Sequence, residues 1–218
     1  MRFFTTAILA LTIACGFTTA ARADYFFWRD AKTGLSLSFP DTWRMVSGLQ
    51  PDDVITIMAP SGRANAQCRV RVDSDRRFMI YPPRYAPQIQ KLNLGADFWN
   101  DYLKTYNDDQ PYNLEDGAGL GRGYAGYAEA SYVSAVPGPK MPRRGVLFAT
   151  IYFGKLYVLD CSAHRDAFAQ WVYPFLDIAK SVDFKPAYHT LTTGNYRNFE
   201  VDPRIQFWNH KDKPAEVY

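Results

Sequence analysis

The sequence predicts an α+β protein with a central antiparallel sheet sandwiched between helices, followed by an aromatic C-terminal extension. Segments with the two-residue period of strands alternate with segments of helical spacing, in the order strands, helix, strands, helix. Hydrophobic residues make up 47% of the chain and aromatic residues 16%, which is enough to fill a core between a sheet and its helices. At 218 residues the chain fits one domain.

Three short strands are predicted in the first third of the chain. Over 35–39, large apolar residues alternate with serines, which is the pattern of a half-buried strand. The apolar run 54–58 predicts a second strand, which a turn at Pro60-Ser61-Gly62 ends. A third strand, over 67–73, has one apolar face (Cys68, Val70 and Val72) and one polar face (Gln67, Arg69, Arg71 and Asp73).

Helical spacing replaces the strand pattern between residues 82 and 107. Aromatic residues four positions apart predict an amphipathic helix over 96–106 (Phe98, Tyr102 and Tyr106). Strand signals return over 121–135, and segments 146–153 and 156–161 predict a tight hairpin turning at Gly154-Lys155. The last predicted helix covers 166–182, and Pro174 inside it predicts a kink or a broken first half.

The first 23 residues have the features of a secretory signal peptide. A positive start precedes an apolar run over 7–17, and small residues occupy the two positions that a signal peptidase recognises. The run is too short to span about 30 Å of hydrocarbon, so we expect cleavage after Ala23 and a periplasmic or secreted protein. A lipid anchor at Cys15 is not expected, because Thr12 stands where lipoprotein signals carry leucine.

The charge balance of the mature chain argues against some partners. Removing Arg2 and Arg22 with the leader reduces the 25 basic residues to 23, against 22 acidic residues. This near-neutral balance gives no reason to expect nucleic acid or an anionic membrane surface as a partner. No apolar stretch after residue 23 approaches the roughly 20 residues of a spanning helix, so we expect a soluble protein without a membrane span.

Two cysteines remain after export, Cys68 and Cys161. Disulfides persist outside the cytoplasm, and a single pair allows only one intramolecular connection. We therefore expect a Cys68–Cys161 disulfide, with two buried free thiols as the alternative.

The mature chain is divided into a domain over 24–184 and a C-terminal extension over 185–218. Disordered segments are poor in aromatic residues, and this extension is rich in them, so we expect it to pack on the domain. A strand near 197–201 or 205–208 is one form that this packing could take.

Residues 34–43, with the sequence GLSLSFPDTW, resemble the opening of PsbP-like proteins. The segments 143–153, 156–161 and 179–184 resemble the closing part of the same proteins, so the resemblance covers about 32–185. It implies an α/β/α sandwich shared with the Ran-binding Mog protein and with exported bacterial proteins of unassigned role. It implies no catalytic residues, because the family has diverse binding and assembly roles.

No motif in the chain predicts a catalytic, metal or cofactor site. Residues 121–126 fit the G-x-G-x-x-G pattern, but a strand follows where nucleotide binding needs a helix. The three histidines have no metal-ligand spacing, and His164 is expected to cap the last helix. The pairs Asp52-Asp53 and Arg143-Arg144 are expected to be solvated, in a turn and at a strand end respectively.

These observations favour a non-catalytic exported protein that binds a protein partner or assists assembly of an envelope complex. The aromatic excess supports this, because exposed aromatic residues often mark a partner surface. One alternative is a small-ligand-binding protein with a groove lined by Tyr and Trp between the sheet and the extension. A less favoured alternative is an exported hydrolase, which would need His164 or His189 beside a nucleophile.

Overall fold

The structure is a computed structural model. It describes residues 24–46, 51–76, 85–106, 111–120, 123–134, 140–152, 154–184, 208–209 and 213–214. The expected signal peptide therefore lies outside the described residues, as does most of the C-terminal extension.

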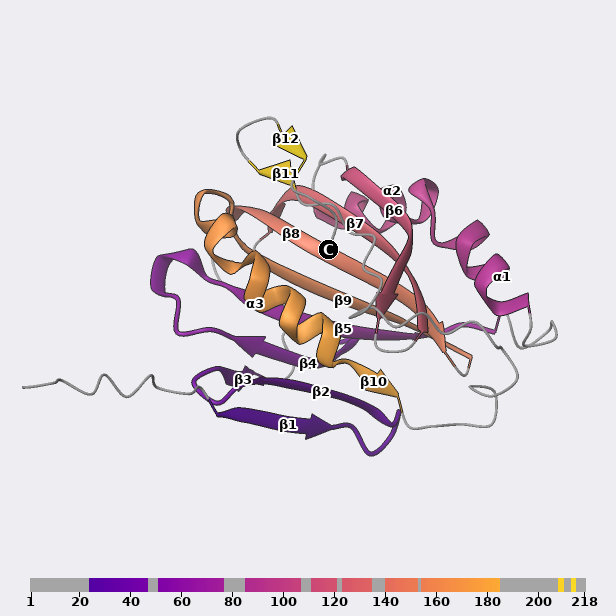
Figure 1. The fold of residues 1–218 in the computed structure, drawn as a ribbon, viewed down its shortest axis with the longest axis horizontal. Coiled ribbons are helices and arrows are strands. Elements are labelled where there is room, and N and C mark those ends of the chain that lie inside the picture. Colours follow the sequence, from indigo (N-terminus) through magenta and orange to yellow (C-terminus); the bar gives the residue numbers. More distant parts are fainter. Residues whose placement is uncertain are drawn as a thin grey trace, which may run out of the picture.

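Seven antiparallel strands form the central sheet, in the spatial order β3-β4-β5-β9-β8-β7-β6 (Figure 1). Their bounds are β3 Arg44–Val46, β4 Asp53–Met58, β5 Gln67–Ser74, β6 Pro111–Leu120, β7 Gly123–Ser134, β8 Met141–Tyr152 and β9 Lys155–His164. The β8–β9 hairpin turns at Gly154, whose φ of 71° is a left-handed conformation that glycine adopts without strain. The predicted antiparallel sheet is confirmed.

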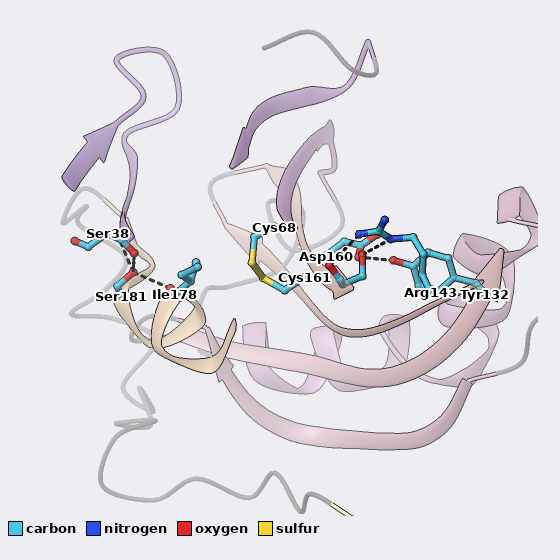
Figure 2. The surroundings of a disulfide bond; sticks show 9 residues. Ser38, Cys68, Tyr132, Arg143, Asp160, Cys161, Ile178 and Ser181 are labelled. Carbon is cyan, nitrogen blue, oxygen red and sulfur yellow. Dashed lines mark hydrogen bonds between the residues drawn. A yellow bond between two sulfur atoms is a disulfide. The ribbon is translucent and has the colours of Figure 1, made fainter. Parts of the chain in front are cut away.

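A smaller sheet, in the order β1-β2-β10, lies beside the central one. Its strands are β1 Tyr25–Arg29, β2 Leu35–Pro40 and β10 Asp183–Phe184. Beyond β10, the Ser181 side chain continues the pairing of β2, because its hydroxyl donates to the Ser38 carbonyl and accepts from the Ser38 N–H, both at 2.9 Å (Figure 2). Both edges of β2 are thus occupied, which separates this sheet from the central sheet.

Helices lie on both faces of the central sheet (Figure 1). Helix α3, Phe168–Ser181, follows the 3-10 turn η4, Arg165–Ala167, and contacts β2, β8 and β9. On the opposite face, α1, Ala86–Asn93, contacts β7, and α2, Ala96–Leu103, contacts β6. The 3-10 turn η3, Lys104–Tyr106, continues α2, so the predicted helix over 96–106 is confirmed.

Alternate residues of β8 divide the interior into two cores. Val146 and Phe148 belong to the core under α3, whereas Leu147, Ala149 and Ile151 belong to the core under α1 and α2. This is the result of the two-residue period of a strand with both faces covered. The sandwich of one antiparallel sheet between helices is therefore the fold that the sequence predicts.

The structure differs from the sequence prediction at several elements. Strands β1, β3 and β6 were not predicted, and β8 and β9 are longer than the predicted hairpin segments. Helix α3 continues through Pro174 without a break, because the residues after it are firmly packed: Phe175 and Ile178 are fully buried. In the extension, Trp208–Asn209 (β11) pairs with Lys213–Pro214 (β12) as a separate two-stranded sheet, and the expected strand over 197–201 lies outside the described residues.

Candidate functional site

The predicted disulfide joins the two central strands of the core under α3. Cys68 of β5 and Cys161 of β9 are direct cross-strand partners, with their Cα atoms 3.9 Å apart (Figure 2). Both residues are buried, and they are 93 positions apart in the sequence. The bridge therefore fixes two distant parts of the chain to each other at the centre of the sheet.

On the opposite face of the sheet, Arg69 and Asp53 form a buried ion pair. The Arg69 Nη2 atom lies 2.8 Å from Asp53 Oδ1, and Arg69 Nε lies 3.2 Å from Oδ2. Burial alone would lower the pKa of Arg69, but the bond to Asp53 and neighbouring negative groups raise it. The expectation that Asp53 is solvated is wrong, because Asp53 is the first residue of β4 and its side chain is 1% exposed.

Next to this pair, Tyr132 of β7 reaches across β8 to Asp160 of β9. The Tyr132 hydroxyl donates a 2.7 Å hydrogen bond to Asp160 Oδ1 (Figure 2). The Tyr102 hydroxyl donates to Oδ2 of the same carboxylate at 3.4 Å. Burial, and then the Asp160 charge, raise the pKa of both phenols well above 10. A Cβ at Gly145 of β8 would lie 3.0 Å from both the Cys161 carbonyl oxygen and Ser162 Cβ, so glycine allows the close approach of β8 and β9 here.

Arg143 is fully buried on the same face. Its Nε donates to Ser162 Oγ at 3.0 Å, and its Nη2 donates to the carbonyls of Ser162 and Asn65 at 2.9 and 2.7 Å. The prediction of a solvated strand end is wrong here, because β8 already begins at Met141 and pairs with β9 as far as His164. A guanidinium with this set of partners ties the turn that contains Asn65 to the sheet.

Arg144, on the other face, is also mostly buried. It forms an ion pair with Glu129 of β7, its Nε lying 2.7 Å from Oε1, and its guanidinium lies 5.0 Å from the centre of the Phe168 ring. Sequence reasoning missed this role as well, because the covering residue Phe168 belongs to a helix that begins 24 positions later.

A groove of about 720 Å³ opens at β3, β4 and the turn that follows β4. Its polar lining includes Thr42, Arg44, Ser61 and Asn65, and its apolar lining is formed by Val46, Met58, Ala59 and Pro60. Arg44 pairs with Met58 across β3 and β4, and Val46 pairs with Thr56, so these side chains share the face on which Arg69 lies. No aromatic residue lines this groove.

Strand β1 exposes three consecutive aromatic side chains. Tyr25, Phe26 and Phe27 are 58%, 45% and 60% exposed. The strand lies at the end of the three-stranded sheet and is paired there with β2 (Figure 1). Exposed aromatic residues of the kind that often mark a partner surface therefore occur on the strand that follows the expected cleavage site.

The residues considered for chemistry have structural partners. The Nδ1 atom of His164 accepts a 3.3 Å hydrogen bond from the Asp166 N–H at the start of η4, which is the predicted capping role. The Ser162 hydroxyl accepts from Arg143. His189 and His210 lie outside the described residues.

The glycine-rich segment 121–126 is not followed by a helix. Its described part, from Gly123, belongs to β7, which agrees with the strand interpretation. A Cβ at Gly126 would lie 2.6 Å from the Leu94 carbonyl oxygen, so glycine is needed there for the close approach of the α1–α2 connection.

Two further features concern the described residues as a whole. Within these ranges no group of three or more His, Cys, Asp or Glu side chains is placed to hold a metal ion. Of the described helices, none combines the length and the apolar composition needed to cross a bilayer.

The chain is similar to several solved structures. One is cyanobacterial PsbP from Synechocystis sp. PCC 6803, at 18% identity and a TM-score of 0.48, with 77% of this chain and 96% of that chain covered. Another is LpqN of Mycobacterium tuberculosis, described as involved in cell envelope biogenesis, at 15% identity and a TM-score of 0.42, with 75% and 91% covered. A third, at 12% identity and a TM-score of 0.45, is a Pseudomonas aeruginosa protein of unknown function, with 75% and 99% covered.

No family model and no curated protein matches the sequence. The sequence motifs resemble those of PsbP-like proteins, and a cyanobacterial PsbP is among the similar solved structures. With TM-scores below 0.5, these similarities do not indicate what the chain binds or does.

Proposed function

We propose that this chain is an exported, non-catalytic protein that binds a partner protein through strand β1 and so assists assembly of an envelope complex. The observation that carries the proposal is the exposure of Tyr25, Phe26 and Phe27, side by side on an edge strand. Aromatic side chains are enriched among the residues that dominate the binding energy of interfaces. Each side chain leaves on the order of 100 Å² exposed, given the 150–250 Å² that such residues bury when enclosed.

Tyr25 and Phe27 point to the same face of β1 and together expose roughly 200 Å² of apolar surface, whereas Phe26 points to the other face and packs against Phe39. Edge strands are usually protected by charged residues, prolines or a covering element. On β1 one charged residue is present, Arg29, whose guanidinium lies 6.0 Å from the centre of the Phe27 ring. No described strand pairs with the outer edge of β1. The occupant that fits this surface is an apolar strand or loop of another protein.

The strand is held firmly enough to act as a preformed surface. All five of its residues pair with β2, and the ring centre of Phe26 lies 5.4 Å from that of Phe39 in the core. Trp28 is partly buried and packs against the same core. A preformed surface binds more tightly, because less conformational entropy is lost on association.

Export is supported by the signal-peptide features of the sequence and by the disulfide, since disulfides persist mainly outside the cytoplasm. The absence of catalysis remains part of the proposal. It is supported by Ser162, which is fully buried and therefore out of reach of a substrate.

The test uses the complete exported chain and a matched pair of variants. The double variant Tyr25→Ser, Phe27→Ser removes two outward rings of β1, whereas Tyr173→Ser removes an equally exposed ring, 63% exposed, from α3. A protein recovered with the unaltered chain is purified separately and its affinity for each form is measured. We expect the β1 variant to weaken binding by at least about tenfold, because interface hot spots contribute 2 kcal/mol or more.

Equal affinity of the β1 variant and the unaltered chain would contradict the proposal. Photo-crosslinks from position 27 to residues 185–218 of the same chain would also contradict it, because the extension would then occupy β1. Crosslinks to a second copy of this chain would also contradict it, because β1 would then be the interface of a homodimer. Melting curves of both variants control for folding.

A further inference from the structure

The groove beside Arg44 is separate from β1 and has the composition of a small-ligand site. A volume of about 720 Å³ is in the range of pockets that enclose small molecules, and four of its lining side chains are apolar. Among the described residues that line it, Arg44 is the only one with a charged side chain, and it is exposed. A mixed lining of this kind fits a ligand with one polar group and an apolar body.

The wall of the groove is fixed from beneath by hydrogen bonds. The Ala59 N–H donates to the Ala66 carbonyl at 2.9 Å, and the Ala66 N–H donates to Ser61 Oγ at 2.7 Å. The Asn65 carbonyl accepts from the buried Arg143 at 2.7 Å. The turn between β4 and β5 is therefore held in place before any ligand binds, which reduces the entropy lost on binding.

Charge in and around the groove favours an anion. Arg44 forms no ion pair with any residue in the described ranges, and no acidic side chain is among the described residues that line the groove. Arg143 lies behind the wall with bonds to carbonyl, hydroxyl and thioether groups. Arg63, exposed on the neighbouring 3-10 turn η1, Gly62–Ala64, does not line the groove.

We propose that this groove binds a small amphipathic carboxylate. The carboxylate pairs with the Arg44 guanidinium, whose planar fork can donate two hydrogen bonds to it. The apolar body lies on Val46, Met58 and Pro60. A cationic head group would be repelled by Arg44, and a wholly apolar ligand would cover the guanidinium without pairing it, which is costly.

This carboxylate could come from two sources, a free aliphatic acid or the C-terminus of a peptide that ends in apolar residues. The two probes are decanoate and the dipeptide acetyl-Leu-Val with a free carboxylate. The controls are decyltrimethylammonium and the dipeptide amide, which keep the apolar bodies and remove the negative charge. Binding is followed on the complete exported chain by the NMR signal of the Met58 methyl group, assigned with Met58→Leu.

We expect at least one carboxylate probe to shift the Met58 signal in a saturable manner, and both controls to bind at least about tenfold more weakly. Arg44→Gln should weaken carboxylate binding by about tenfold or more, and Arg44→Lys should restore part of it, since hydrogen bonds to charged groups are the stronger ones. Arg63→Gln is the matched control and should change the affinity by less than about threefold, because exposed charges a few residues away are screened.

The carboxylate probe that binds more tightly identifies the source of the ligand, which is either a free aliphatic acid or the C-terminus of a peptide. Equal binding of decanoate and decyltrimethylammonium, an unchanged affinity in Arg44→Gln, or no shift with either carboxylate would overturn the inference. Each of these results leaves the proposed role of β1 untouched, because the variants and the readout lie on different strands.

Discussion

The hydroxyl group of Tyr132 lies 2.7 Å from Asp160 Oδ1, and this hydrogen bond connects β7 to β9 across the strand between them. Asp160 is 1% exposed, so it depends on such donors for the solvation of its charge. Gly145 lets β8 and β9 approach closely, because a Cβ there would lie 3.0 Å from Ser162 Cβ. The Tyr132–Asp160 hydrogen bond thus carries a buried polar contact across three strands.

Tyr132→Phe tests the importance of this bond for stability. Removal of the hydroxyl leaves a buried carboxylate without its shortest hydrogen bond, so we expect the free energy of unfolding to fall by about 1–3 kcal/mol. Chemical denaturation at neutral pH measures the change. Tyr173→Phe, on the exposed surface of α3, is the control and should leave the midpoint unchanged. Indistinguishable midpoints for the two variants would show that Asp160 does not need the Tyr132 donor.

The buried pair of Arg69 and Asp53 should behave as a unit. Asp53→Ala leaves the Arg69 guanidinium buried without its carboxylate, and we expect a loss of about 3–5 kcal/mol in the free energy of unfolding. Adding Arg69→Met to this variant removes the uncompensated charge, so the double variant should be more stable than Asp53→Ala alone. A double-mutant cycle by urea denaturation measures the coupling. Additive losses would contradict the account of this pair.

The Cys68–Cys161 disulfide should contribute strongly to stability, because it joins residues 93 positions apart. In the chain-entropy model such a bridge contributes about 4 kcal/mol. We expect reductant to lower the melting temperature by several degrees, at roughly 2–4 °C per kcal/mol for a domain of this size. The Cys68→Ala, Cys161→Ala variant should have the melting temperature of the reduced protein, and reductant should not change it. Identical melting with and without reductant, with two free thiols found by mass spectrometry, would remove the bridge from the account.

Buried tyrosines should make the fold sensitive to alkaline pH. Burial, opposed by the Thr33 hydroxyl and assisted by the Asp30 charge, raises the pKa of Tyr157 to about 12. The folded state keeps this proton in a range where the unfolded chain loses it, above the ordinary value of about 10. The stability contribution is therefore fully present below pH 10 and is lost as the pH rises from about 10 to about 12.

The measurement is the melting temperature as a function of pH, for the unaltered chain and for Tyr157→Phe. We expect the variant to lose less stability above pH 10, by roughly 2–3 kcal/mol, since one pKa unit corresponds to 1.36 kcal/mol. Parallel curves for the two proteins over the whole alkaline range would count against a buried, protonated phenol at this position.

Local sequence patterns were sufficient for most elements of the fold. The serine alternation of 35–39 predicted β2, the alternating faces of 67–73 predicted β5 with Cys68 directed into the core, and the four-residue aromatic spacing predicted α2. In each case the periodic pattern lies within a few consecutive residues, and it arises because one face of the element is buried. The disulfide followed because only one pairing was available.

Burial of charged residues could not be predicted in the same way. Arg69, Arg143 and Asp53 resemble solvated residues in their own windows, but residues far away in the sequence cover or pair with them. Strand β6 was missed because glycine and acidic residues weaken its own strand signal, and its pairing with β7 supplies the hydrogen bonds. The groove was missed too, because Arg44 and Asn65 come together only through the turn between β4 and β5.

The aromatic strand was visible in the sequence only as an excess of large apolar residues. The composition could not distinguish core residues from surface residues, and the structure shows that Tyr25, Phe26 and Phe27 remain largely exposed. This exposure is the basis of the proposed function.

Site-specific photo-crosslinking in cells tests the central claim most directly. A photoreactive phenylalanine at position 27 is compared with the same residue at position 173, which is equally exposed on α3. The account predicts one discrete crosslinked product with another envelope protein from position 27 and none from position 173. Products of the same kind from both positions, or from neither, would contradict a partner surface on β1.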